Sequence, residues 1–150
     1  MKHQIILLGK DITSVYHGIK EFGPDHVHLL CTNETKEVAA PLFPLLPDGI
    51  RRTLYRTEPY DGEHVRNVCR KIHQTYPSAE FAYNLSEGTK VMAFAAFTIA
   101  KEYSVPAFYL SQIGELIRLD SFEKYPMQSQ LYNNEILGLR GDILTAYQAE

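Results

Sequence analysis

The sequence has few of the features that mark secreted or redox-active proteins. It contains only two cysteines, Cys31 and Cys69, and no Cys-x-x-Cys pair, which excludes a disulfide scaffold and leaves no redox or zinc motif. We expect both cysteines to be reduced, buried thiols. The apolar stretch near the amino terminus, residues 5–9, is too short for a secretory signal or a membrane span. The sequence therefore predicts a cytoplasmic protein with no membrane partner.

An excess of positive charge is also missing. The 15 Lys and Arg residues are outnumbered by 18 Asp and Glu, for a formal net charge of −3. A chain of this charge has no general attraction to DNA or RNA, so any nucleotide must be held by a local cluster of donors. With 150 residues, 45% of them hydrophobic, the chain is long enough to bury one full core without disulfides or metals.

Strand and helix patterns alternate along the chain. The run at residues 4–8 is apolar throughout, as in a strand buried on both faces of a parallel sheet. The predicted fold is α/β, a Rossmann-like, open, doubly wound and mainly parallel sheet that ends in an antiparallel hairpin. We predict strands over residues 4–8, 26–31, 52–57, 80–85, 105–110 and 115–119. We predict helices that follow a Thr13 or Ser14 cap, that begin near Glu34 with Thr32 or Asn33 as the cap, and that begin at Asp61 and at Val91.

The Rossmann-like domain is expected to span residues 1–120. Residues 121–150 indicate a polar connection and then a last helix capped by Asn133 or Asn134. That helix either closes the domain or forms the stem of a fused effector domain.

The predicted helix over residues 91–103 is apolar on every side, with Met92, Phe94, Phe97 and Ile99 distributed around its axis. One face of such a helix can cover a sheet while another meets a second chain. We therefore expect a homodimer.

Two polar loops follow predicted strands and precede predicted helices. In an open α/β sheet, ligands bind at the carboxyl ends of the strands where the winding direction reverses. Helix starts there offer backbone N–H groups to phosphate, although serine and threonine at a helix start commonly serve only as caps. The candidate ligand-binding residues are Lys10, Thr13 and Ser14 in the first loop and Asn84, Ser86, Glu87, Gly88, Thr89 and Lys90 in the second.

Two common nucleotide motifs are absent. No Gly-x-Gly-x-x-Gly occurs, and the Gly88-Thr89-Lys90 triplet lacks the earlier glycine of a P-loop, so a dinucleotide dehydrogenase or an ATPase is poorly supported. His26 and His28 are two residues apart on one strand, a spacing that two metal ligands could use. The sequence places no third ligand beside them, so we interpret them as structural histidines and predict no metal and no cofactor.

The segment from Asn84 to Met92, Asn-Leu-Ser-Glu-Gly-Thr-Lys-Val-Met, resembles the Asn-x-Thr-Gly-Gly-Thr-Lys-x-Met signature of the CARF domains. These are the CRISPR-associated Rossmann-fold sensors of Card and Can type effectors, and the layout of residues 2–120 is similar to theirs. The resemblance implies a homodimer that binds cyclic oligoadenylate, foremost cyclic tetra-adenylate, across its two-fold axis in type III CRISPR antiviral signalling. It also implies that Ser86, Gly88, Thr89 and Lys90 contact phosphate or ribose, together with Thr13 and Ser14.

The sequence departs from that signature at Glu87, where the pattern has glycine. A carboxylate beside an anion site repels the ligand. Either Glu87 points away and pairs with a lysine such as Lys10, or it accepts hydrogen bonds from an adenine amino group or a ribose hydroxyl.

Two other functions remain open at this point. Some members of the family cleave the ring that they bind, without a metal. In a stand-alone ring nuclease, Lys90 would stabilise the transition state while Thr13 or Ser14 orients the phosphate. Alternatively, the chain is a generic Rossmann-like module for an ordinary mononucleotide or a protein partner.

Overall fold

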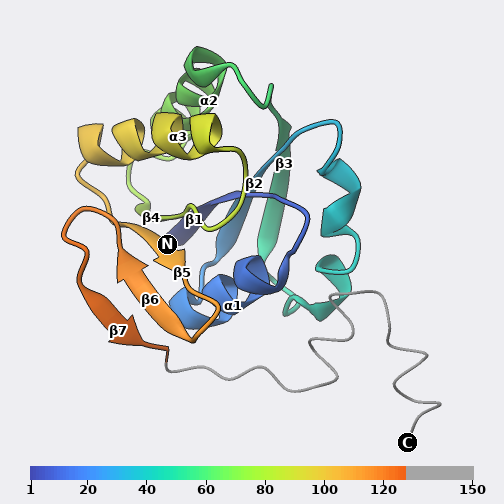
Figure 1. Ribbon diagram of the computed structural model, residues 1–150. Helices are drawn as coiled ribbons and strands as arrows, with labels where there is room; N and C mark the ends of the chain where they lie inside the picture. Colours follow the sequence, from blue (N-terminus) through green and yellow to red (C-terminus); the bar gives the residue numbers. More distant parts are fainter. Residues whose placement is uncertain (128–150) are drawn as a thin grey trace, which may run out of the picture.

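A computed structural model describes residues 1–127 of the chain. A single sheet of seven strands runs through the domain in the order β3-β2-β1-β4-β5-β6-β7, with helices on both faces (Figure 1). The first five strands in the chain are parallel and the last two are antiparallel. Their bounds are β1 (Lys2–Leu7), β2 (His26–Cys31), β3 (Arg51–Arg56), β4 (Glu80–Asn84), β5 (Ala107–Leu110), β6 (Glu115–Arg118) and β7 (Lys124–Pro126).

The winding of the chain reverses at the centre of the sheet. β1 pairs with β2 on one side and with β4 on the other, with Ile5 opposite Tyr83 in the second pair. The loops after β1 and β4 therefore begin at the same end of the sheet, at the carboxyl ends of the two strands, and lead to helices on opposite faces. Folds of this kind bind ligands at that point. This confirms the predicted doubly wound, mainly parallel sheet with its antiparallel hairpin.

The burial of the strands follows their place in the sheet. All six residues of β2 and five of the six in β1 are buried, as expected for central parallel strands. β3 alternates between exposed and partly buried residues at the edge. Both cysteines are buried and unbridged, as predicted.

Helices cover the two faces unequally. α2 (Gly62–Thr75) and α3 (Lys90–Glu102) pack side by side on one face, over a core that includes Tyr83 and Met92. α1 (Thr13–Phe22) and two short 3-10 helices, η1 (Lys36–Ala39) and η2 (Phe43–Leu45), cover the other face. Within residues 1–127, no helix is long and apolar enough to cross a membrane.

One predicted helix cap and one predicted helix are wrong. Neither Thr13 nor Ser14 caps α1, because Ile12 occupies the N-cap position and the Asp11 carboxylate accepts the Thr13 N–H at 2.9 Å. No α-helix begins near Glu34 either. Pro41, Pro44 and Pro47 interrupt that segment, since proline lacks an N–H and disfavours helical geometry in the residue before it, so only η1 and η2 form.

The end of the described chain differs from the predicted polar connection. Residues 124–126 form β7, which pairs with β6. Such a short strand carries too little alternation to be recognised from sequence. The predicted last helix, with Asn133 or Asn134 as its cap, lies outside the described residues.

A buried histidine in α2 gives the fold a predicted sensitivity to acid. His73 shares a hydrogen bond of 2.8 Å with the Tyr83 hydroxyl and stacks on Tyr103 at 4.0 Å. Burial lowers the pKa of His73 to about 4. Because the unfolded state then binds a proton more readily, the contribution of His73 to stability is complete above its unfolded pKa and is lost as the pH falls towards the folded value.

We therefore expect the free energy of unfolding to fall between about pH 6.5 and pH 4, with up to about 3 kcal/mol of the loss due to His73. Denaturant titrations at several pH values measure this. In His73→Phe the slope against pH should be reduced whatever the stability at pH 7. An unchanged slope would contradict the assignment.

Candidate functional site

The loops after β1 and β4 meet at one hollow of about 500 Å³. Thr13 and Ser14 line it from the start of α1, while Ser86 and Glu87 line it from the other loop. Tyr109 and the turn between β5 and β6 close its remaining side. Residues that the sequence placed in two separate loops are thus neighbours in the fold.

Asn84 ties the two loops together. Its side-chain Nδ2 donates to the Ser14 carbonyl at 3.3 Å, and its Oδ1 accepts from the Ser86 N–H at 3.1 Å and the Ser86 hydroxyl at 2.6 Å. Gly18 permits this approach, because a Cβ atom there would lie 2.5 Å from Nδ2. The buried Asn84 side chain thus joins the two loops through these three hydrogen bonds.

The hydroxyls of Ser86 and Thr89 are also engaged within the protein. Ser86 Oγ accepts the Leu110 N–H at 2.9 Å, so it fixes the loop to β5. Thr89 is the N-cap of α3, where its Oγ1 accepts from the Met92 N–H at 3.1 Å and donates to the Pro59 carbonyl. Their hydrogen bonds determine the shape of the loop.

The backbone conformation at position 88 requires glycine. Its φ of +88° lies in the left-handed region that side chains avoid, and an added Cβ atom would lie 3.0 Å from Leu7 Cβ. The loop therefore packs closely over the end of β1, and only glycine fits there.

The Glu87 side chain extends toward the first loop. Its carboxylate lies against Gly9, where an added Cβ atom would overlap Oε1. Burial raises the pKa of Glu87, an effect that a backbone hydrogen bond at Asp11 opposes. Among the ion pairs of residues 1–127, none joins Glu87 to Lys10, and Lys10 lies exposed outside the hollow. The first alternative for Glu87, pairing with Lys10, is therefore not what the structure has.

Three candidate residues keep groups that a ligand could use. Thr13 and Ser14 line the hollow, and their hydroxyl oxygens are buried with no hydrogen-bond partner within the described part of the chain. Their side chains would have to turn toward the hollow to meet a ligand. Lys90 is exposed in the first turn of α3, where unpaired backbone N–H groups favour anions. Together they are donors suited to phosphate.

A second, apolar hollow of about 450 Å³ adjoins the first and shares Ser86, Glu87 and Tyr109 with it. Lys90 and Phe94 line it from α3, and Phe122 lines it from the segment after β6. Phe94 is 76% exposed and Phe122 is 72% exposed, which is unusual for large apolar side chains. Sequence reasoning missed Tyr109 and Phe122, because no local pattern brings them to these loops.

This architecture is the Rossmann-like fold of the CARF domains. Can2 from Sulfobacillus thermosulfidooxidans, solved with cyclic tetra-adenylate, is similar to this chain with a TM-score of 0.83 and 21% identity over 94% of it. A type III CRISPR defence DNA nuclease activated by cyclic oligoadenylate gives a TM-score of 0.73 and 21% identity over 92%. Enterococcus italicus Csm6, bound to a cyclic hexa-2′-fluoro-hexa-dAMP, gives 0.67 and 13% over 95%.

The chain spans only part of these proteins, namely 41%, 23% and 38% of their respective lengths. No sequence-family model matches the chain, and no curated protein sequence matches it either. The likeness therefore concerns the fold.

Proposed function

We propose that two copies of this chain form a sensor that holds a cyclic oligoadenylate, foremost cyclic tetra-adenylate, across their two-fold axis in type III CRISPR antiviral signalling. The observation that carries the proposal is the meeting of the loops after β1 and β4 beside an exposed apolar face of α3. Two-fold symmetry uses each set of donors twice with one geometry, which matches a symmetric ring of phosphates. Binding would rearrange the dimer and so switch an effector domain fused to the chain.

Each candidate residue has a role in this proposal. Lys90 and the start of α3 bind phosphate, and Thr13 and Ser14 donate hydroxyl hydrogens from the start of α1. Asn84, Ser86 and Thr89 hold the loops in place through their own hydrogen bonds. Gly88 lets the loop backbone pass close to β1.

The apolar hollow supports the dimer. Phe94 and Phe122 expose most of their surface beside the phosphate donors, and burying such side chains against a second copy is favourable. A dimer formed there would bring two copies of Lys90 to one axis.

A second candidate is a ring nuclease, favoured by the unpartnered hydroxyl of Ser14 at the hollow. In that reaction a ribose 2′-hydroxyl of the ring attacks the adjacent phosphorus. The 2′-hydroxyl gives up its proton as the new 2′-oxygen–phosphorus bond forms and the bond to the 5′-oxygen breaks. The 5′-oxygen takes up a proton, so protons balance and no water is consumed. The product is a linear strand with a 2′,3′-cyclic phosphate, and Lys90 would stabilise the charge that develops.

Incubation of the purified chain with labelled cyclic tetra-adenylate and EDTA tests both functions. Intact ring that remains bound supports sensing, whereas linear products that disappear in Lys90→Ala support cleavage. If AMP raises the melting temperature and the cyclic oligoadenylates do not, both functions are contradicted and the chain binds an ordinary mononucleotide.

Glu87→Gln isolates the role of the carboxylate beside the site. If Glu87 only packs against the first loop, removing its charge lessens its repulsion of the phosphates. Two like charges near a protein surface repel each other by about 1 kcal/mol, so we expect the affinity for the ring to rise by about threefold to tenfold. Fluorescence titration measures the change, with Glu80→Gln as the control, because Glu80 is exposed at the amino end of β4, away from the loops. A loss of affinity would instead show that Glu87 accepts a hydrogen bond from adenine or ribose.

A further inference from the structure

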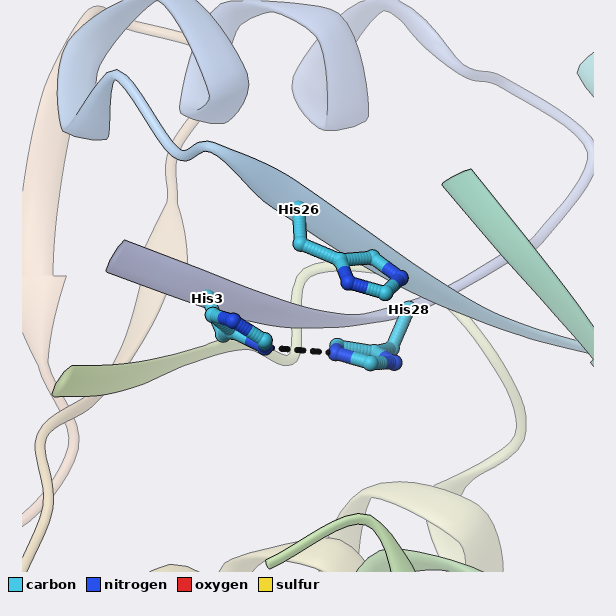
Figure 2. Close-up of side chains that lie close together, drawn as sticks. All are labelled: His3, His26 and His28. Atoms are coloured by element: carbon cyan, nitrogen blue, oxygen red, sulfur yellow. Dashed lines mark hydrogen bonds between the residues drawn. The ribbon is translucent and has the colours of Figure 1, made fainter. Parts of the chain in front are cut away.

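Three histidines gather at the amino ends of the central strands, at the end of the sheet opposite the nucleotide loops. His3 of β1 lies opposite His26 of β2 in the parallel register, and His28 follows two residues along β2 on the same face. Their side chains point toward one another (Figure 2). The three residues are 3%, 1% and 0% exposed. The pairing of β1 with β2 thus supplies the third histidine that the sequence did not place.

The ring nitrogens of the three histidines lie close together, and one of them has no hydrogen-bond partner within the described chain. One nitrogen from each histidine lies within 4.8 Å of one from each of the others. His3 Nδ1 and His28 Nε2 face each other at 2.9 Å and share one hydrogen bond. His26 Nδ1 is buried and has no hydrogen-bond partner within the described chain. A buried acceptor or donor left without a partner is costly, so this nitrogen needs an explanation.

The outer nitrogens of the two β2 histidines are held by hydroxyls of the neighbouring strand β3. His26 Nε2 is 2.8 Å from Thr53 Oγ1, and His28 Nδ1 is 2.8 Å from the Tyr55 hydroxyl. When both outer nitrogens donate, the lone pairs of His26 Nδ1 and His28 Nε2 are directed inward. Histidines that bind metals are commonly oriented in this way, with one nitrogen fixed by a hydrogen bond and the other free for the ion.

The surroundings keep the rings neutral and enclosed. Burial lowers the pKa of His28 to about 3 and that of His26 to about 4, so the lone pairs remain available at neutral pH. Tyr76 packs against all three rings, with ring centroids 4.8 to 5.4 Å away. A hollow of about 220 Å³ reaches His3 from the surface between Met1 and Tyr76, which gives an ion and a water molecule a route in.

We propose that His3, His26 and His28 bind one divalent first-row transition metal ion, for which Zn²⁺ is the reference, with a fourth position open to water. Three neutral imidazoles are a ligand set suited to zinc, copper or nickel and unsuited to Mg²⁺ or Ca²⁺. Zinc takes imidazole nitrogens at about 2.0–2.1 Å in a tetrahedron, so its ligand nitrogens lie about 3.3 Å apart. His3 Nδ1 and His28 Nε2, now 2.9 Å apart, would separate slightly, and the more distant nitrogens of the cluster, up to 4.8 Å apart, would draw together. The proton that His3 and His28 share would leave His3 Nδ1 for His3 Nε2 as the ion takes its place. The ion would join β1 to β2 and satisfy His26 Nδ1.

The experiments use the full, untagged chain after treatment with EDTA and removal of the chelator. Zn²⁺ titrated by calorimetry should bind at one ion per chain and raise the melting temperature, because binding to the folded state alone stabilises it. Co²⁺ should give the intense visible bands of a tetrahedral ion. His26→Gln should abolish both signals, whereas His64→Gln, on α2 and outside the cluster, should retain them.

Tyr55→Phe tests the supporting hydrogen bond without removing a ligand. It should weaken Zn²⁺ binding by about tenfold or more and leave the stoichiometry unchanged. Weak or multiple binding by the unaltered chain, a six-coordinate Co²⁺ spectrum, or equal binding by His26→Gln would overturn the proposal. The Co²⁺ spectrum of the unaltered chain decides the matter even if a variant fails to fold. None of these readouts depends on cyclic oligoadenylate.

Discussion

Phe94→Glu is expected to convert the dimer into monomers and to lower the affinity for cyclic tetra-adenylate by at least about 100-fold. Burying a Phe side chain is worth about 2–3 kcal/mol, and a two-fold axis uses the residue twice. Phe94 is 76% exposed in the single chain, so the substitution costs little within one copy. In the dimer it would place two carboxylates in an apolar contact, close to the phosphates of the ring.

Light scattering after size exclusion measures the mass, and a fluorescence titration measures ring affinity. Leu54→Glu is the matched control, because Leu54 is 45% exposed on β3 at the far edge of the sheet. This substitution should leave the mass and the ring affinity unchanged. A Phe94→Glu protein that remains dimeric, or a monomer that still binds the ring tightly, would contradict the proposed interface.

Lys90→Ala is expected to weaken ring binding by about 100-fold while the chain remains folded and dimeric. A hydrogen bond from a charged donor contributes roughly 1.5–3 kcal/mol, and the symmetric site would lose two such donors. Lys90 is exposed and follows the Thr89 cap, so its removal leaves the hydrogen bonds of the loop intact. The salt dependence of affinity should also decrease, because fewer cations meet the phosphates.

Lys101→Ala provides the control, since Lys101 occupies the last turn of the same helix and is also exposed. Its affinity for the ring should match that of the unaltered chain. If Lys90→Ala binds equally well, Lys90 has no part in the site, and the start of α1 must hold the phosphates instead.

Local patterns are enough to predict strands β1 to β6 and helices α1, α2 and α3. The strand β1 is marked by a short apolar run. The start of α2 is marked by the Asp61 cap, whose carboxylate accepts the His64 N–H at 3.1 Å. Both signals involve only residues that are close together in the sequence. The α1 cap was predicted wrongly because Asp11, two residues earlier, supplies the acceptor for Thr13. The α-helix predicted near Glu34 was wrong because Pro41, Pro44 and Pro47 interrupt the segment before β3.

The site could be predicted only as two separate loops. Their meeting depends on β1 lying beside β4, and the bond from Asn84 to the Ser14 carbonyl spans 70 residues of sequence. The third histidine of the buried cluster has the same origin, since His3 reaches His26 only through the pairing of β1 with β2. Strand order is a property of the whole chain, so no spacing along the sequence could reveal either contact.

The number of chains that share one ring is the most direct test of the central claim. Calorimetric titration of the full chain with cyclic tetra-adenylate, together with native mass spectrometry of the complex, gives that number. We expect one ring for every two chains, held by a dimer. One ring per single chain, or no binding of the ring under conditions where the chain is folded, would contradict it.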